Sequence, residues 1–113
     1  MNKYRDKSDF EINKAVAVNK LSPELIVEKN NKIYISEGDS GVIVRFDPCN
    51  NPADAMPIVI ENGICMNYIG KDIGWGARHF DEEKGELEIY DKNYYRAAMI
   101  CFLMMKDAEN EKV

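Results

Sequence analysis

The stretch RAAMICFLMM, residues 96–105, decides the fold of this chain. Apolar side chains cover most of the circumference of a helix that should run from a cap at Asp91 or Asn93 to about Ala108. A helix of this kind is normally buried, and its small residues let a sheet approach its backbone closely. Burial on two sides in so short a chain predicts a central helix, or a helix that contributes to a dimer contact.

The rest of the chain is dominated by short segments with the composition of β-strands. Turn signals separate them, among them Asn30-Asn31 and residues 82–85, and Asn tolerates the positive φ of a two-residue hairpin. Most connections are of hairpin length, which predicts antiparallel pairing. The expected strands are residues 24–29, 32–36, 41–46, 64–69, 73–80 and 86–90.

Two further helices are expected before the central one. Ser8 and Glu11 have the spacing of a capping box, and the helix that follows should end near Lys20. Residues 47–55 indicate a turn-rich loop, after which Pro57 should begin a short helix that Gly63 stops. The short apolar run of residues 58–60 would also suit a strand.

The fold class that these elements predict is α+β. It is a small single domain, residues 1–113, with a mostly antiparallel sheet packed against a buried C-terminal helix. A short N-terminal helix and a short central helix complete it. Residues 1–7 and 109–113 are expected to be flexible.

Composition excludes several classes of protein. The 113 residues are 45% hydrophobic and 31% charged, which is typical of a globular domain rather than a disordered chain. A net charge of -5 argues against nucleic-acid binding, which needs a positive field. The longest apolar run, residues 97–105, is far shorter than the ~20 residues of a membrane span. The N-terminal residues do not have the pattern of a signal peptide, so we expect a cytoplasmic protein without membrane contact.

The cysteines indicate neither a disulfide framework nor a metal site. Cys49, Cys65 and Cys101 are odd in number and widely spaced, and His79 is the sole histidine. A closed zinc site would need all four residues to converge. Reduced thiols, and no metal or other cofactor, are the expectation.

Five polar residues between positions 47 and 54 are the first candidate site. Asp47 and Asp54 could act as acid and base, or as cation ligands, in a polar pocket. The favoured alternative is turn chemistry, in which Asp and Asn side chains bond nearby backbone amides and cap the next helix. The candidate binding residues here are Asp47, Asn50, Asn51 and Asp54.

Trp75, Arg78 and His79 form the second candidate site. An exposed Trp and Arg together are typical of an interface anchor, so Trp75 and Arg78 are candidate binding residues. On an alternating strand, however, Trp75 and His79 share one face and Arg78 takes the other. A core Trp with a surface Arg is the favoured interpretation. His79 is a candidate general base, and it could activate Cys49 only if the two lay side by side.

Four segments together resemble a known family. They are SDFEINKAVA (8–17), FDPCNNPADAMPIVIENGI (46–64), GWGA (74–77) and RAAMICFLMM (96–105), and their order is similar to that in the NinX-like family of small proteins of tailed phages and prophages of enterobacteria. Family members often carry Trp shortly before the P-I-I segment, where this chain has Ala55-Met56. The resemblance implies a phage or prophage origin and an accessory role, but no reaction and no catalytic residues.

Three functional hypotheses follow. The first is a non-catalytic module that binds a host or phage protein in the bacterial cytoplasm. A homodimer is compatible with this hypothesis. The alternative is a small hydrolase or nucleotide-acting enzyme, whose Asp47, Asp54 and His79 would have to converge within ~4 Å of a shared point. The third, nucleic-acid binding, would use the N-terminal basic residues Lys3, Arg5 and Lys7, against the acidic balance of the chain.

Overall fold

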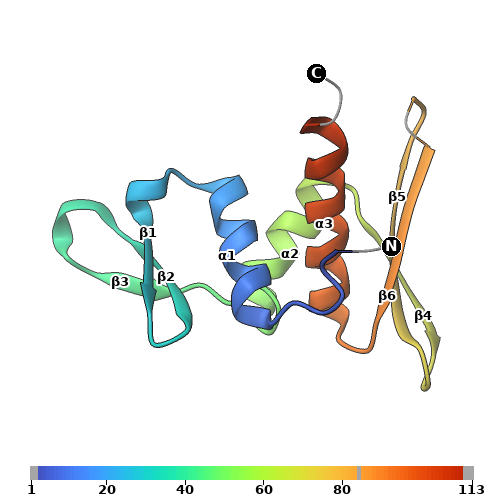
Figure 1. The fold of residues 1–113 in the computed structure, drawn as a ribbon, viewed down its shortest axis with the longest axis horizontal. Coiled ribbons are helices and arrows are strands. Elements are labelled where there is room, and N and C mark those ends of the chain that lie inside the picture. The colour runs from blue at the N-terminus through green and yellow to red at the C-terminus, as the bar shows by residue number, and fades with distance from the viewer. Residues whose placement is uncertain (1–2, 84, 111–113) are drawn as a thin grey trace.

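The computed structural model describes residues 3–83 and 85–110, and it has two sheets with a layer of helices between them (Figure 1). This α+β single domain, with its C-terminal helix packed on a sheet, confirms the predicted fold class. Two short 3-10 helices, η1 and η2, accompany the α-helices and strands. The elements are α1 (Asp9–Lys20), η1 (Pro23–Leu25), β1 (Ile26–Lys29), β2 (Lys32–Ser36), η2 (Gly38–Ser40), β3 (Ile43–Arg45), α2 (Pro52–Glu61), β4 (Cys65–Gly70), β5 (Gly74–Asp81), β6 (Gly85–Asp91) and α3 (Tyr94–Asn110).

The strands form two sheets rather than one. β1, β2 and β3 pair in that order, as do β4, β5 and β6, and every pairing is antiparallel. The division falls where residues 46–64, with α2 among them, separate β3 from β4. Figure 1 shows the β1–β3 sheet projecting on the side of α1, away from the β4–β6 sheet beyond α3.

α3 is the centre of the fold, as the sequence predicts. It packs against β5 and β6 on one side and against α1 and α2 on the other. Its residues from Ala97 to Leu103 are all buried. Each large apolar side chain there, such as Phe102 or Ile100, contributes about 1.5–3 kcal/mol by leaving water.

Two local signals of the sequence have the expected structures. The Ser8 hydroxyl accepts a hydrogen bond from the amide of Glu11 at 3.1 Å, and the Glu11 carboxylate accepts one from the Ser8 amide at 3.2 Å. This is the complete capping box. Asn30 and Asn31 have φ of 53° and 58°, as a two-residue hairpin turn requires.

The start of α2 differs from the prediction. Its first residue is Pro52, capped by the Asn51 side chain, so Pro57 lies inside the helix rather than at its beginning. Both prolines satisfy the same sequence signal, and the earlier one has the better cap. Pro57 cannot donate to the carbonyl of Ala53, yet the helix continues because its apolar face packs against α3.

Candidate functional site

Asp47 and Asp54, the candidate acid and base, are hydrogen-bonded to each other, and Asp47 is also bonded to α1. The amide of Asp47 donates to Oδ2 of Asp54 at 2.9 Å. Asp47 Oδ1 accepts from Nδ2 of Asn13, a buried residue of α1, at 2.8 Å. The same Asn13 accepts from the amide of Cys49 at 3.0 Å. Both carboxylates therefore help to fix the loop between β3 and α2 against α1.

Asn50 and Asn51 also form intramolecular bonds. Asn51 accepts from the amide of Ala53 at 3.1 Å as the cap of α2, and its amide group donates to Asp54. Asn50 donates to Asp9 at 3.1 Å and accepts from Asn93, at the start of α3, at 3.2 Å. The four polar candidates of this segment thus connect the beginnings of all three helices.

His79 lies apart from these carboxylates. It lines a small cavity of about 40 Å³ whose wall includes Met105, near the end of α3. Asp47 is linked through Asn50 to Asn93 at the start of the same helix. Asn93 and Met105 are twelve positions apart along the helix, which corresponds to about 18 Å. The shared pocket of Asp47, Asp54 and His79 that the enzyme hypothesis requires is not formed.

Trp75 and Arg78 lie on opposite faces of β5, as the alternation predicts. The Trp75 ring packs edge-on against Tyr68 and against Tyr94 of α3, with centroids 5.2 and 4.9 Å apart. Arg78 points to the other side, where it pairs with Glu86 at 3.5 Å. The two residues therefore do not form a common anchor.

Arg78 belongs to the side of the β4–β6 sheet that α3 does not cover, which we call the outer face. Phe80 is 67% exposed there, Tyr90 48% and Ile69 45%. A Cβ at Gly76 would come within 3.1 Å of the Tyr90 ring, so the glycine lets that ring lie across β5. The outer face, alternating along its three strands, consists of Cys65, Asn67, Ile69, Gly76, Arg78, Phe80, Glu86, Glu88 and Tyr90.

A shallow hollow opens on this face. Its volume is about 440 Å³, and its lining includes Cys65, Arg78, Phe80 and Glu86. Beside it the Tyr90 hydroxyl donates to the Glu88 carboxylate. The outer face thus combines exposed aromatic side chains, an arginine and acidic neighbours.

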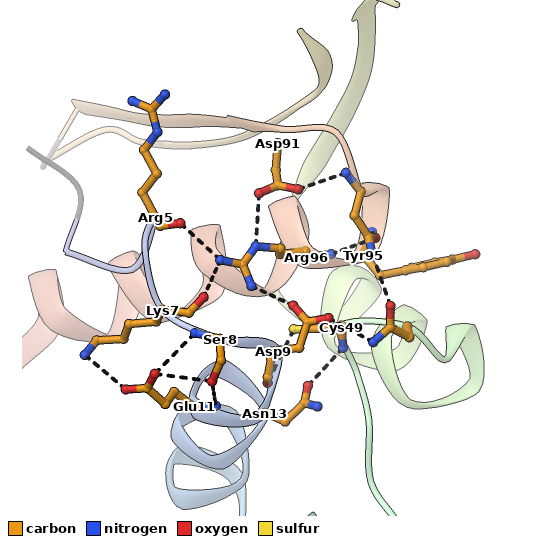
Figure 2. A network of polar contacts seen from close by, with 12 residues as sticks. Arg5, Lys7, Ser8, Asp9, Glu11, Asn13, Cys49, Asp91, Tyr95 and Arg96 are labelled. Atoms are coloured by element: carbon orange, nitrogen blue, oxygen red, sulfur yellow. Dashed lines mark hydrogen bonds and ion pairs between the residues drawn. The ribbon is translucent and has the colours of Figure 1, made fainter. Parts of the chain in front are cut away.

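Arg96 is the residue whose role the sequence analysis missed (Figure 2). Its guanidinium pairs with Asp9 of α1 at 2.6 Å and with Asp91 of β6 at 3.1 Å. It also donates to the main-chain carbonyls of Arg5 at 3.1 Å and Lys7 at 2.6 Å. The N-terminal segment, α1 and β6 are thereby all held to the first turn of α3.

The environment keeps Arg96 charged. Burial alone would lower its pKa, but the hydrogen bond to Asp9 and the charges of Asp91 and Asp9 raise the pKa above the usual value. The sequence did contain a signal, because Arg96 is the one charged residue between Asn93 and Met105. A lone charge in a buried helix must be paired.

The N-terminal segment has a second attachment to α3. Tyr4 is buried, and its hydroxyl donates to Asp107 at 2.6 Å. The flexibility expected for residues 1–7 and 109–113 stays a prediction, and residues 1–2 and 111–113 lie outside the described part of the chain.

The three cysteines have different environments. Cys49 and Cys101 are buried and Cys65 is exposed. Burial raises the pKa of Cys101 to about 12. The pKa of Cys49 is also raised, first by burial and then by the charge of Asp9. Neither buried thiol is set up as a nucleophile, and His79 is not beside Cys49.

In residues 3–83 and 85–110, no group of three or more His, Cys, Asp or Glu side chains is placed to hold a metal ion. None of the helices described is both long and apolar enough to cross a membrane.

Comparisons with known proteins give one positive result. The sequence model of the family described as "Bacteriophage P22, NinX" matches residues 3–106. No curated protein and no solved structure matches the chain. The match covers nearly the whole sequence, so the chain belongs to the P22 NinX family of bacteriophage proteins.

Proposed function

We propose that this phage accessory protein is a non-catalytic protein-binding module that acts in the cytoplasm of the bacterial host. The observation that supports it is the outer face of the β4–β6 sheet, where Phe80, Tyr90 and Ile69 are exposed around Arg78. Aromatic and arginine side chains are enriched among the residues that dominate binding energy at protein interfaces.

The charges around this face indicate the chemistry of the partner. Glu86 and Glu88 lie on the face itself, and Glu82 lies in the turn between β5 and β6. Arg78 is paired with Glu86, so the local balance is acidic, like that of the whole chain. A host or phage protein with an apolar pocket inside a basic rim would complement it. The same balance disfavours nucleic acid as the partner.

The polar residues near Asp47 support binding over catalysis. Their side chains already bond one another, Asn13 or Asp9, and these contacts hold helices together. A general acid or base must instead reach its substrate within hydrogen-bond distance. We therefore place the function on the outer face and give these residues a structural role.

Affinity capture from an enterobacterial lysate, with and without nuclease, tests this proposal. The baits are the wild type, Phe80→Asp on the outer face, and Val18→Asp as the matched control. Val18 is an exposed apolar residue of α1, at 57% exposure. One stoichiometric protein should survive nuclease treatment on the wild type and on V18D, and be lost from F80D.

Two outcomes would count against the proposal. Equal loss from F80D and V18D would mean that the outer face is not the binding surface. Retention that disappears with nuclease would point to nucleic acid instead. Cys65 offers a second readout, because it lies on the same face and is exposed. A bulky maleimide on Cys65 should block capture of the same protein.

A further inference from the structure

β3 forms an open edge of the β1–β3 sheet, and its apolar side chains are exposed. β3 pairs with β2 only, and Val42, Ile43 and Val44 are 49%, 39% and 46% exposed. Natural sheets usually protect such edges with lysine, proline, a bulge or a covering segment. Arg45 is the one charged residue of β3, and its side chain pairs with Asp47.

Hydrogen bonds to β2 show which backbone groups face the open edge. The amide of Phe46 donates to the Ile33 carbonyl at 2.8 Å, and the amide of Glu37 donates to the Val42 carbonyl at 2.9 Å. Antiparallel pairs alternate between bonded and non-bonded. The main-chain groups of Val42, Val44 and Phe46 therefore point toward β2. Those of Ile43 and Arg45 point outward.

We propose that β3 pairs with β3 of a second copy of this chain, antiparallel and centred on Val44. In this register Ile43 lies opposite Arg45 of the second copy, and Arg45 opposite its Ile43. Each of these pairs exchanges two main-chain hydrogen bonds. The two sheets become one, in the order β1-β2-β3-β3-β2-β1, and the contact is isologous.

Neighbouring registers fit less well. Centring on Arg45 would place two arginines directly opposite each other, which destabilises a strand pair. Centring on Ile43 would set Arg45 opposite Gly41, whose φ of 77° is not that of a strand. Val44 is the centre that pairs β3 residues with β3 residues and keeps like charges apart.

In the proposed pairing, the apolar side chains of the two copies also meet on the face of the sheet that is turned toward α2. Val44 shares this face with its cross-strand neighbour Ile35, and Ile35 lines a groove of about 250 Å³ with Phe46, Pro57 and Ile58. The second copy brings its own Val42 and Val44 to this face. Apolar side chains that are half exposed in one copy are covered by the same residues of the other.

The size of the contact predicts its strength. A pair of short strands buries less than the ~1,200 Å² of a standard interface, so we expect a weak dimer. Each copy carries a net charge of -5, and salt should strengthen the dimer by screening this repulsion. In sedimentation equilibrium we expect the fraction of dimer to increase with protein concentration and with salt.

Cysteine cross-linking tests the register, in a Cys65→Ser background that removes the exposed native thiol. The two Val44 positions form a non-hydrogen-bonded pair with Cα atoms about 4.5 Å apart, which suits a disulfide. The two Val42 positions would lie about 13 Å apart. Mild oxidation should therefore link Val44→Cys and leave the Val42→Cys control unlinked.

Charge exchange tests the same contact without a covalent bond. Val44→Lys and Val44→Glu should each be folded and monomeric, because like charges meet at the centre. An equal mixture of the two should dimerise. Phe80→Asp, on the other sheet, should leave the dimer unchanged, which separates this inference from the proposed function.

Three results would overturn the inference. They are a wild type that stays monomeric at high concentration and high salt, equal linking of the two cysteine variants, and a V44K/V44E mixture that does not associate. A monomeric wild type whose captured partner is lost from V44K would assign the edge to a foreign strand instead.

Discussion

Replacing Arg96 by methionine removes the cation that joins four segments of the chain, while a similar apolar volume is kept. The Arg96 side chain is 13% exposed, and the side chains of its partners Asp91 and Asp9 are 21% and 42% exposed. Breaking a fully buried pair costs about 3–5 kcal/mol because one charge is left without its partner. Neither pair here is fully buried, so each contributes less.

The loss in the free energy of unfolding can be calculated from the exposure of each partner of Arg96. Loss of the pair with Asp91 should cost about 2 kcal/mol, since little water reaches that carboxylate. Asp9 is more exposed, and loss of its pair should cost about 1 kcal/mol. The two carbonyls of the N-terminal segment can bond water instead and add about 0.5 kcal/mol each. We expect R96M to lose about 4 kcal/mol in total.

Urea unfolding followed by circular dichroism measures this loss directly. A domain of this size has a free energy of unfolding of about 5–15 kcal/mol, so R96M should still fold, with a Tm about 10–20 °C lower. Amide exchange near Lys7 and Ser8 should accelerate, because their segment loses its attachment to α3. Arg96→Lys keeps the charge but loses the fork of donors, and should fall between the wild type and R96M.

Arg5→Met is the matched control for this prediction. Arg5 contacts Arg96 through its main-chain carbonyl, so its side chain can be replaced without loss of that bond. R5M should lie within about 0.5 kcal/mol of the wild type. If R96M does the same, or if a double-mutant cycle with Asp9→Asn gives no coupling, the role assigned to Arg96 is refuted.

Three further predictions concern the cysteines and α2. A thiol reagent such as DTNB should modify Cys65 in the folded protein and reach Cys49 and Cys101 after denaturation; rapid reaction of all three would contradict their burial. Burial raises the pKa of Cys101 to about 12 and that of Cys49 as well, so the folded state retains protons that the unfolded state releases above about pH 8.5. The contribution of the two buried thiols to the free energy of unfolding is therefore complete below pH 8.5. It is lost as pH rises toward 12, by up to about 1.4 kcal/mol per group per pH unit. Urea titrations in which the wild type loses no more stability with pH than C101A would count against this prediction. Pro57→Ala restores a donor inside α2 and should stabilise the protein by about 1–2 kcal/mol, seen as a higher Tm, whereas a lower Tm would mean that the proline ring packs favourably.

The parts of the fold that the sequence predicts correctly are those set by neighbouring residues. Ser8 and Glu11 are three positions apart, so their capping box forms from local geometry alone. The Asn30-Asn31 turn is equally local. The burial of α3 could be inferred because its composition leaves hardly any polar face.

The parts that escaped prediction depend on contacts between distant residues. Two prolines offered a start for α2, and the choice of Pro52 depends on the Asn51 cap and its bonds to Asp54 and Asp47. The pairing of Arg96 with Asp9 joins residues 87 positions apart, which no spacing rule contains. The division into two sheets falls at α2, which lies between β3 and β4 in the chain and packs against the distant α3.

The position of α3 in the chain has a consequence for synthesis in the cell. α3 is the last element in the order, yet both α1 and the β4–β6 sheet pack on it. Ribosomes add about 5–20 residues per second, so the earlier elements wait for seconds before their common core emerges. During that interval the hairpins can form, but their apolar faces stay exposed to chaperones and proteases. The common core can therefore form only after α3 has been synthesised.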